Sequence, residues 1–192
     1  MTKEISRDLS GLFRHFPKVT VVVTAHGGRK DNAMAAGFHS PVSFKPPLYG
    51  VALLPKHFTY KLIVESGEFG INFLPLEAAE LVASVGGCSG WKVDKFQRFN
   101  IDKDKPVKTS VPILETAYAA YECRLVDDKK YGDHQWLVGE VVAVHMVKGA
   151  FTPQQIPDLD KINPAITLSN KYYLTTLKES LRNIDPAVYG KQ

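Results

Sequence analysis

The chain has 192 residues, of which 44% are hydrophobic and 23% are charged, and its formal net charge is +4 at pH 7. This is the composition of an ordinary globular protein, and solubility alone accounts for so small a charge. The sequence has no basic run of the kind that binds nucleic acid, and no apolar segment reaches the roughly 20 residues needed to cross a bilayer. Because the polar N-terminus differs from a signal peptide, we expect a cytoplasmic protein without nucleic-acid or membrane partners.

Extended segments open the predicted fold. Residues 18–26 are dense in β-branched side chains and predict a strand that is buried on both faces near its middle. A turn over residues 28–32 leads into a second extended segment that starts at Ala33. Residues 48–54 follow two prolines, which cannot continue a helix, and their apolar run predicts a further strand.

Short helices interrupt the strands. Residues 57–65 carry apolar side chains at helical spacing, and Gly67 just past the end predicts a glycine stop. Residues 68–74 return to a strand pattern. Pro75 then begins a second helix, predicted over residues 76–85 and ended by two glycines.

The second half of the chain predicts two long strands, over residues 118–126 and 136–147, joined by a charged loop over 127–132. The segment from Phe151 to Tyr172 is rich in proline and is expected to be irregular, and residues 175–182 predict one last helix. Antiparallel strands with inserted short helices favour a mainly β, α+β barrel over a doubly wound parallel sheet. We expect a single domain over residues 1–192, with the barrel core in residues 15–150 and a C-terminal extension in residues 151–192.

Several common functional motifs are absent from the sequence. It contains no dinucleotide-binding glycine fingerprint, no phosphate-binding loop of the Walker type and no Gly-x-Ser-x-Gly elbow. Cys88 and Cys123 lack the spacing of metal ligands and are expected to be reduced thiols. No two histidines have the i, i+4 spacing of a helical metal site, so no metal is expected, although histidines on neighbouring strands could still converge on one.

A series of motifs in a fixed order resembles that of the flavin reductase-like family, particularly its flavoredoxin and ferric-reductase branch. Residues 32–47 read NAMAAGFHSPVSFKPP and precede the strand LYGVAL. The later motifs are FTY, GEFGINF, SGWKVDKF, VPILE, GDH and VGEVV, within residues 58–142. The resemblance implies an antiparallel FMN-binding split β-barrel with short helices packed outside. It also implies a homodimer with the flavin near the subunit interface.

The resemblance and the chemistry of FMN together imply the site. Small residues after Asn32 would let the backbone approach the flavin ring, and cations beside the helix that starts near His57 would bind its phosphate. FMN suits this phosphate-sized cluster better than FAD. His134 in the GDH motif is expected to position a reactant, and so is the predicted catalytic residue. The residues expected to contact the cofactor are Asn32, Ala33, Met34, Ala35, Ala36, Ser40, Lys56, His57, Thr59, Ser89, Lys95 and His134.

The implied function is that of a flavin or ferric reductase that takes hydride from NADH or NADPH and passes electrons through FMN. Free flavin, a ferric chelate or a partner protein would accept them. An FMN-containing electron carrier without its own nicotinamide site is the alternative, and a barrel like that of pyridoxamine-phosphate oxidase fits the motifs less well. Many members of the family have Thr and Ser where this chain has Ala35 and Gly37, so two hydroxyl donors are missing. Trp91 could stack on the flavin or pack as a structural residue, and the sequence assigns no role to His39.

Overall fold

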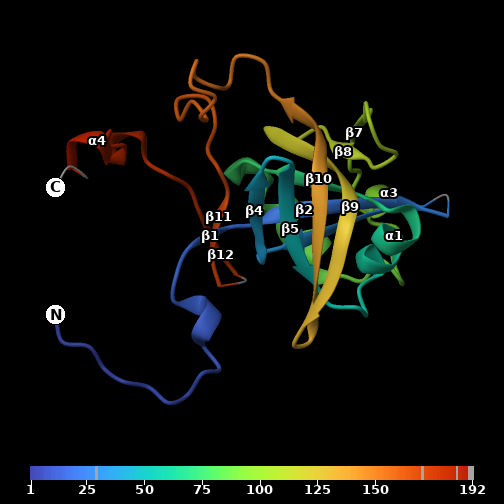
Figure 1. The fold of residues 1–192 in the computed structure, drawn as a ribbon, viewed down its shortest axis with the longest axis horizontal. Helices are drawn as coiled ribbons and strands as arrows, with labels where there is room; N and C mark the ends of the chain where they lie inside the picture. The colour runs from blue at the N-terminus through green and yellow to red at the C-terminus, as the bar shows by residue number, and fades with distance from the viewer. Residues whose placement is uncertain (29, 170, 185, 190–192) are drawn as a thin grey trace.

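A seven-stranded antiparallel sheet is the body of the fold (Figure 1). The computed structural model describes residues 1–28, 30–169, 171–184 and 186–189. In spatial order the strands are β3 (Lys30–Ala36), β2 (Val21–Gly27), β6 (Glu68–Phe73), β9 (Ala119–Tyr131), β10 (His134–Met146), β5 (Pro47–Leu53) and β4 (His39–Phe44).

The sheet curls into a barrel that is split between its two edge strands. The ladder order ends at β3 on one side and β4 on the other, and β3 contacts β5 across the barrel. Register shifts at Val138/Gly139 and Val141/Ala143 bend the long β9–β10 hairpin, as β-bulges do. A Cβ at Gly139 would lie 2.5 Å from the Phe69 ring, so the missing side chain lets that ring fill the barrel. The predicted mainly β antiparallel barrel is confirmed.

Strand β2 is buried on both faces, as predicted. Val21 and Val23 point into the barrel, where they pack with Phe69. Val22 points to the opposite face and packs with Ala33 in a second core beneath the helices. Both cores are apolar, which explains why this strand reads as a continuous β-branched run rather than an alternating one.

Three helices pack outside the sheet. The sequence predicts the first two, although the second begins and ends later than expected. α1 (Phe58–Ser66) packs on β2 and ends at Gly67, whose positive φ of 70° suits glycine. α2 (Ala79–Gly87) follows the 3-10 turn η2 (Leu76–Ala78) and includes the two glycines that were expected to end it. α3 (Lys95–Arg98) is capped by the Asp94 carboxylate, which accepts a hydrogen bond from the backbone N–H of Gln97 at 3.0 Å.

Two predictions about the second half of the chain are wrong. Residues 127–131 belong to β9 rather than to a loop, because Gly132 (φ +62°) and Asp133 alone make the turn. Most charged side chains of the segment are exposed, and Asp128 accepts hydrogen bonds from Tyr60 and Gln135. The helix predicted over residues 175–182 is only the 3-10 turn η3 (Lys178–Ser180). Its neighbours Leu177 and Leu181 are exposed, so no packed face supports a longer helix.

The C-terminal extension folds back on the start of the barrel. β11 (Ile166–Leu168), which lies in the segment predicted to be irregular, pairs with both β1 (Lys18–Val19) and β12 (Tyr172–Leu174). The Thr20 and Thr167 hydroxyls share a buried hydrogen bond of 2.8 Å, which fastens the extension to the N-terminal segment. Both ends of the chain leave the barrel on the same side, and the remaining short elements are η1 (Leu12–Arg14) and α4 (Pro186–Tyr189) (Figure 1).

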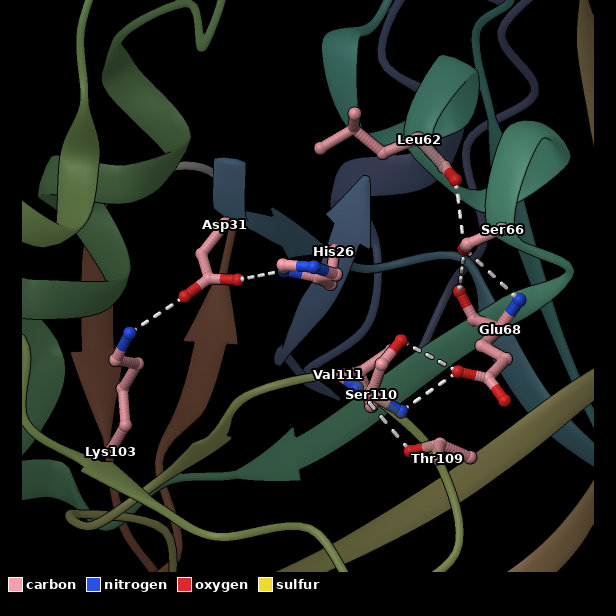
Figure 2. Close-up of polar contacts among 9 residues, drawn as sticks. All are labelled: His26, Asp31, Leu62, Ser66, Glu68, Lys103, Thr109, Ser110 and Val111. Carbon is pink, nitrogen blue, oxygen red and sulfur yellow. Dashed lines mark hydrogen bonds and ion pairs between the residues drawn. The ribbon is translucent and has the colours of Figure 1, made fainter. Parts of the chain in front are cut away.

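Carboxylates fix the connections around α3. Figure 2 shows Asp31 between His26 and Lys103, each 2.7 Å from a carboxylate oxygen. Lys103 belongs to β7 (Lys103–Asp104), which pairs with β8 (Ile113–Leu114), so the ion pair ties the segment after α3 to strand β3.

The following loop is also held by buried or partly buried acids. Glu68 accepts two hydrogen bonds from Ser110 at 2.8 Å (Figure 2). The fully buried Glu122 accepts from the backbone N–H groups of residues 107–109 and from His145 Nε2. Every helix in the described part of the chain falls short of the length and apolarity needed to span a membrane.

Candidate functional site

Two cavities meet along strand β3 and form one elongated groove. Their volumes are about 560 Å³ and 460 Å³. We call the smaller cavity the helix end, because it lies at the start of α1 and the end of α2. We call the larger cavity the extension end, because residues of the N-terminal segment and of the C-terminal extension line it. Both ends share Met34, Ala35, His57, Gly86 and Gly87.

The floor between the two ends contains three small residues, Ala35, Gly86 and Gly87. A Cβ at Gly86 would lie 3.1 Å from the Ala35 Cβ, so the last turn of α2 lies closely against β3. A Cβ at Gly87 would meet no atom within 4 Å, because this residue borders open space. The result is a shallow floor over which a flat molecule can approach the backbone.

A buried lysine lines the helix end. Lys95 is 2% exposed, and its Nζ donates to the carbonyl oxygens of Ala33 at 2.8 Å and Val85 at 2.6 Å. Neither partner is a carboxylate, and an ammonium has three donors, so one N–H is left over. Burial lowers the pKa of Lys95, since the charged form is poorly solvated there. An anionic ligand at the helix end would use the third donor and compensate the buried charge.

Asn32 and Thr59 join β3 to the first turn of α1. The Asn32 Nδ2 donates to the Thr59 Oγ1 at 2.7 Å, and both side chains are buried. The loop that carries Ser89 and Gly90 passes directly over this pair. A Cβ at Gly90 would lie 2.4 Å from the Asn32 Oδ1, so only glycine allows this close approach.

His57 has a polar atom without a partner. It precedes α1 and lines both ends of the groove, yet its Nδ1 is buried and makes no hydrogen bond within the described residues. Burial, followed by the neighbouring charge of Lys56, lowers the pKa of His57. A neutral imidazole therefore lines the groove, and its buried Nδ1 lacks a partner among the described residues.

His134 stands at the extension end. Its Nδ1 lies 2.6 Å from the Asp133 Oδ1, and this hydrogen bond is the main cause of the lowered pKa of Asp133. This hydrogen bond fixes the orientation of the imidazole ring through Nδ1 and does not involve Nε2. The ring packs against Phe38 at 5.5 Å between centroids, and Phe38 in turn packs against Phe13 at 5.0 Å.

The structure brings most of the predicted cofactor residues together. The helix end gathers Asn32, Lys56, Thr59, Ser89 and Lys95. Met34, Ala35 and His57 lie at the junction, and Ala36 and His134 lie at the extension end.

Two predicted residues line neither cavity. The Ala33 side chain is fully buried in the core, and only its carbonyl, which binds Lys95, takes part. Ser40 is exposed on β4 and donates to the Pro41 carbonyl.

Two residues of uncertain role have structural partners. The Trp91 Nε1 donates to the Lys56 carbonyl at 3.0 Å, and its ring packs against Phe58, so Trp91 supports the loop beside the helix end. The His39 Nε2 donates to the Val19 carbonyl at 2.9 Å. Its Nδ1 then accepts from the Tyr49 hydroxyl at 2.7 Å, which makes His39 a link between strands.

The sequence interpretation missed most of the extension end. Its additional lining residues include Ser10, Phe13, Arg14, Lys18, Thr20, Thr167, Ser169 and Tyr173. They come from opposite ends of the chain, and no local pattern marks them. The paired glycines of α2 were the one available signal in the sequence, but they were interpreted only as a helix stop.

The sequence matches the flavin reductase like domain over residues 13–172. It is 28% identical over 144 residues to the ferric-chelate reductase (NAD(P)H) of Archaeoglobus fulgidus, covering 74% of this chain and 83% of that protein. Its fold is similar to an FMN-binding protein from Thermus thermophilus, with a TM-score of 0.84 and 30% identity over 95% and 99% of the two chains. It is also similar to flavoredoxin from Methanosarcina acetivorans, with a TM-score of 0.82 and 25% identity over the whole of both chains.

Proposed function

Since the chain belongs to the flavin reductase-like family, we propose that it is an oxidoreductase that holds FMN in the groove. The phosphate binds at the helix end and the isoalloxazine ring lies over the floor of small residues. The observation that carries this proposal is Lys95, a buried ammonium whose two partners are both carbonyls. A phosphate supplies the negative charge that this cation lacks.

The other residues of the groove fit the same cofactor. Lys56 and the Thr59 hydroxyl lie beside Lys95 at the helix end and suit a single phosphate group. The unpartnered Nδ1 of His57 lies where the phosphate end and the ring would join. The backbone of β3 runs along the floor and offers N–H and C=O groups to a ring edge without the two hydroxyls that many relatives have. FAD would fit the same phosphate position with its adenylate outside the helix end.

When bound, FMN would accept a hydride from NADH or NADPH and pass electrons to free flavin, a ferric chelate or a partner protein. The protein contributes placement and shielding. Lys95 holds the phosphate, and the close packing of α2 on β3 fixes the plane of the floor. His134, oriented by Asp133, lies where it can form a hydrogen bond with the incoming nicotinamide dinucleotide. The wall from the extension borders the space in which hydride would be transferred.

An FMN-containing electron carrier is the second candidate, supported by the similarity to flavoredoxin over both full chains.

We also propose a cytoplasmic homodimer. Large apolar side chains are exposed on both chain ends, among them Ile5, Leu9, Ile184 and Val188, and a second copy of the chain would cover them.

An absorbance spectrum of the purified protein from 300 to 550 nm tests the proposal, with the released cofactor identified by mass. Two bands of oxidised flavin and FMN in the supernatant are expected. Steady oxidation of NADH or NADPH would then distinguish a reductase from a carrier, which would hold flavin without turnover. A colourless protein that fails to bind added FMN or FAD would refute the flavin site.

A further inference from the structure

The extension end of the groove carries two cations that have no partner in the proposed binding of FMN. Arg14 and Lys18 both line this cavity. Within the described residues neither side chain pairs with a carboxylate, and no Asp or Glu lines the cavity. The nearby carboxylates of Asp8 and Asp133 are hydrogen-bonded to Ser10 and His134 and leave both cations without an ion pair.

Aromatic packing holds Lys18 in place and fixes the residue beside Arg14. The Lys18 Nζ lies 5.0 Å from the centre of the Phe38 ring, and its stem crosses Gly37, where a Cβ would come within 3.5 Å. Arg14 follows Phe13, whose ring packs edge-on against Phe38 at 5.0 Å. The same ring of Phe38 contacts His134, so the cations and His134 border one space.

Hydroxyl groups complete the lining of this end. Ser169 and Tyr173 come from the extension, and Ser10, whose hydroxyl donates to the Asp8 carboxylate, comes from the N-terminal segment. Cations together with hydroxyl donors and no carboxylate are the chemistry of a phosphate site.

We propose that Arg14 and Lys18 bind the phosphate groups of the nicotinamide dinucleotide that delivers the hydride. This inference rests on the proposed function, and it adds where the hydride donor binds in the groove. With the FMN phosphate at Lys95, the flavin ring lies over the shared floor. A nicotinamide ring laid against it beside His134 leaves the phosphates of the dinucleotide at the extension end. The groove thus has one anion site for the cofactor and a second for the donor.

The test is equilibrium binding of NADP⁺ and NAD⁺ to the flavin-loaded protein by calorimetry, which needs no turnover. The double variant Arg14→Gln/Lys18→Met removes both charges and keeps most of the side-chain volume. We expect the Kd for NADP⁺ to rise about tenfold for each charge removed. The matched control is Lys3→Met/Arg7→Gln, which makes the same charge change on the same exposed segment outside the groove. Added salt should weaken binding more in the wild type than in the double variant.

The outcomes separate this inference from the proposed function. A larger loss for NADP⁺ than for NAD⁺ assigns the cations to the 2′-phosphate, and an equal loss assigns them to the pyrophosphate. An unchanged Kd in a folded double variant overturns the inference, as does a wild-type holoprotein that binds neither dinucleotide. Loss of flavin from the double variant overturns it too, because the cations would then hold the flavin itself. A wild-type protein that binds NADP⁺ through these cations but takes up no flavin refutes only the proposed function.

Discussion

Replacement of Lys95 by methionine should separate flavin binding from folding. The change removes the ammonium and keeps the length of the buried stem. In the holoprotein the flavin phosphate loses one charge-assisted hydrogen bond, worth about 1.5–3 kcal/mol. This corresponds to a rise in the flavin Kd of roughly 10- to 150-fold.

The stability of the flavin-free protein should change by a smaller amount, because two effects oppose one another. The variant leaves the carbonyls of Ala33 and Val85 without a donor, but it also removes a buried cation that has no carboxylate partner. Flavin titration by fluorescence and urea unfolding of the flavin-free protein measure the two quantities. Lys92→Met, on the exposed loop nearby, is the control.

The pH dependence gives a second measurement on Lys95. Because burial lowers its pKa below 10.5 in the folded protein, the unfolded state binds more protons, and stability without flavin should rise with pH between the two values. A bound phosphate favours the charged form, so flavin affinity should fall as pH rises through the lowered pKa. Both slopes should be absent in Lys95→Met. A flavin Kd equal to that of the wild type, or an equal loss in Lys92→Met, would refute this account of the site.

Three further predictions concern the packing, the loop anchors and the reaction. Gly90→Ala places a Cβ 2.4 Å from the Asn32 Oδ1 and should cost about 1–3 kcal/mol, so an unchanged thermal midpoint would contradict the close approach. Burial alone would raise the pKa of Glu122, but backbone N–H donors lower it from 4.5 to about 2. About 3 kcal/mol of stability should therefore be present above pH 4.5 and lost as pH falls toward 2, and Glu122→Gln should remove that slope in urea titrations. Asp133→Asn should slow flavin reduction by NADPH about tenfold in stopped-flow traces without changing the flavin Kd, because it frees the orientation of His134; equal rates would exclude that role.

Local patterns in the sequence predicted those parts of the fold that depend on neighbouring residues. The β-branched run of β2 and the glycine after α1 each carry their own signal. The loop predicted over residues 127–132 was wrong because the backbone of this charged segment pairs with β10 and Asp128 binds Tyr60 and Gln135, contacts that no local pattern indicates. The last helix was wrong because its propensity has no packed face to support it.

The site, like the fold, was predictable only where a local sequence pattern marks the residues. Lys95 was expected at the cofactor, but its burial depends on carbonyls of β3 and α2 that are distant in sequence. The extension end escaped prediction because Arg14 and Tyr173 come from opposite ends of the chain. The sequence spacing of such residues carries no information about their contact.

The two sides of the groove differ in how firmly the fold holds them. The floor belongs to a strand within the seven-stranded sheet, whereas the opposite wall is joined to the barrel by the short β1–β11 ladder, the Thr20–Thr167 pair and a few backbone hydrogen bonds between residues 74–76 and 163–165. Substitutions in the wall therefore disturb few contacts of the barrel, and ligand preference can diverge there at little cost in stability. A library that aims to change the electron donor should vary the lining residues Ser10, Phe13, Arg14, Lys18 and Ser169, and leave β3 and the Thr20–Thr167 pair intact.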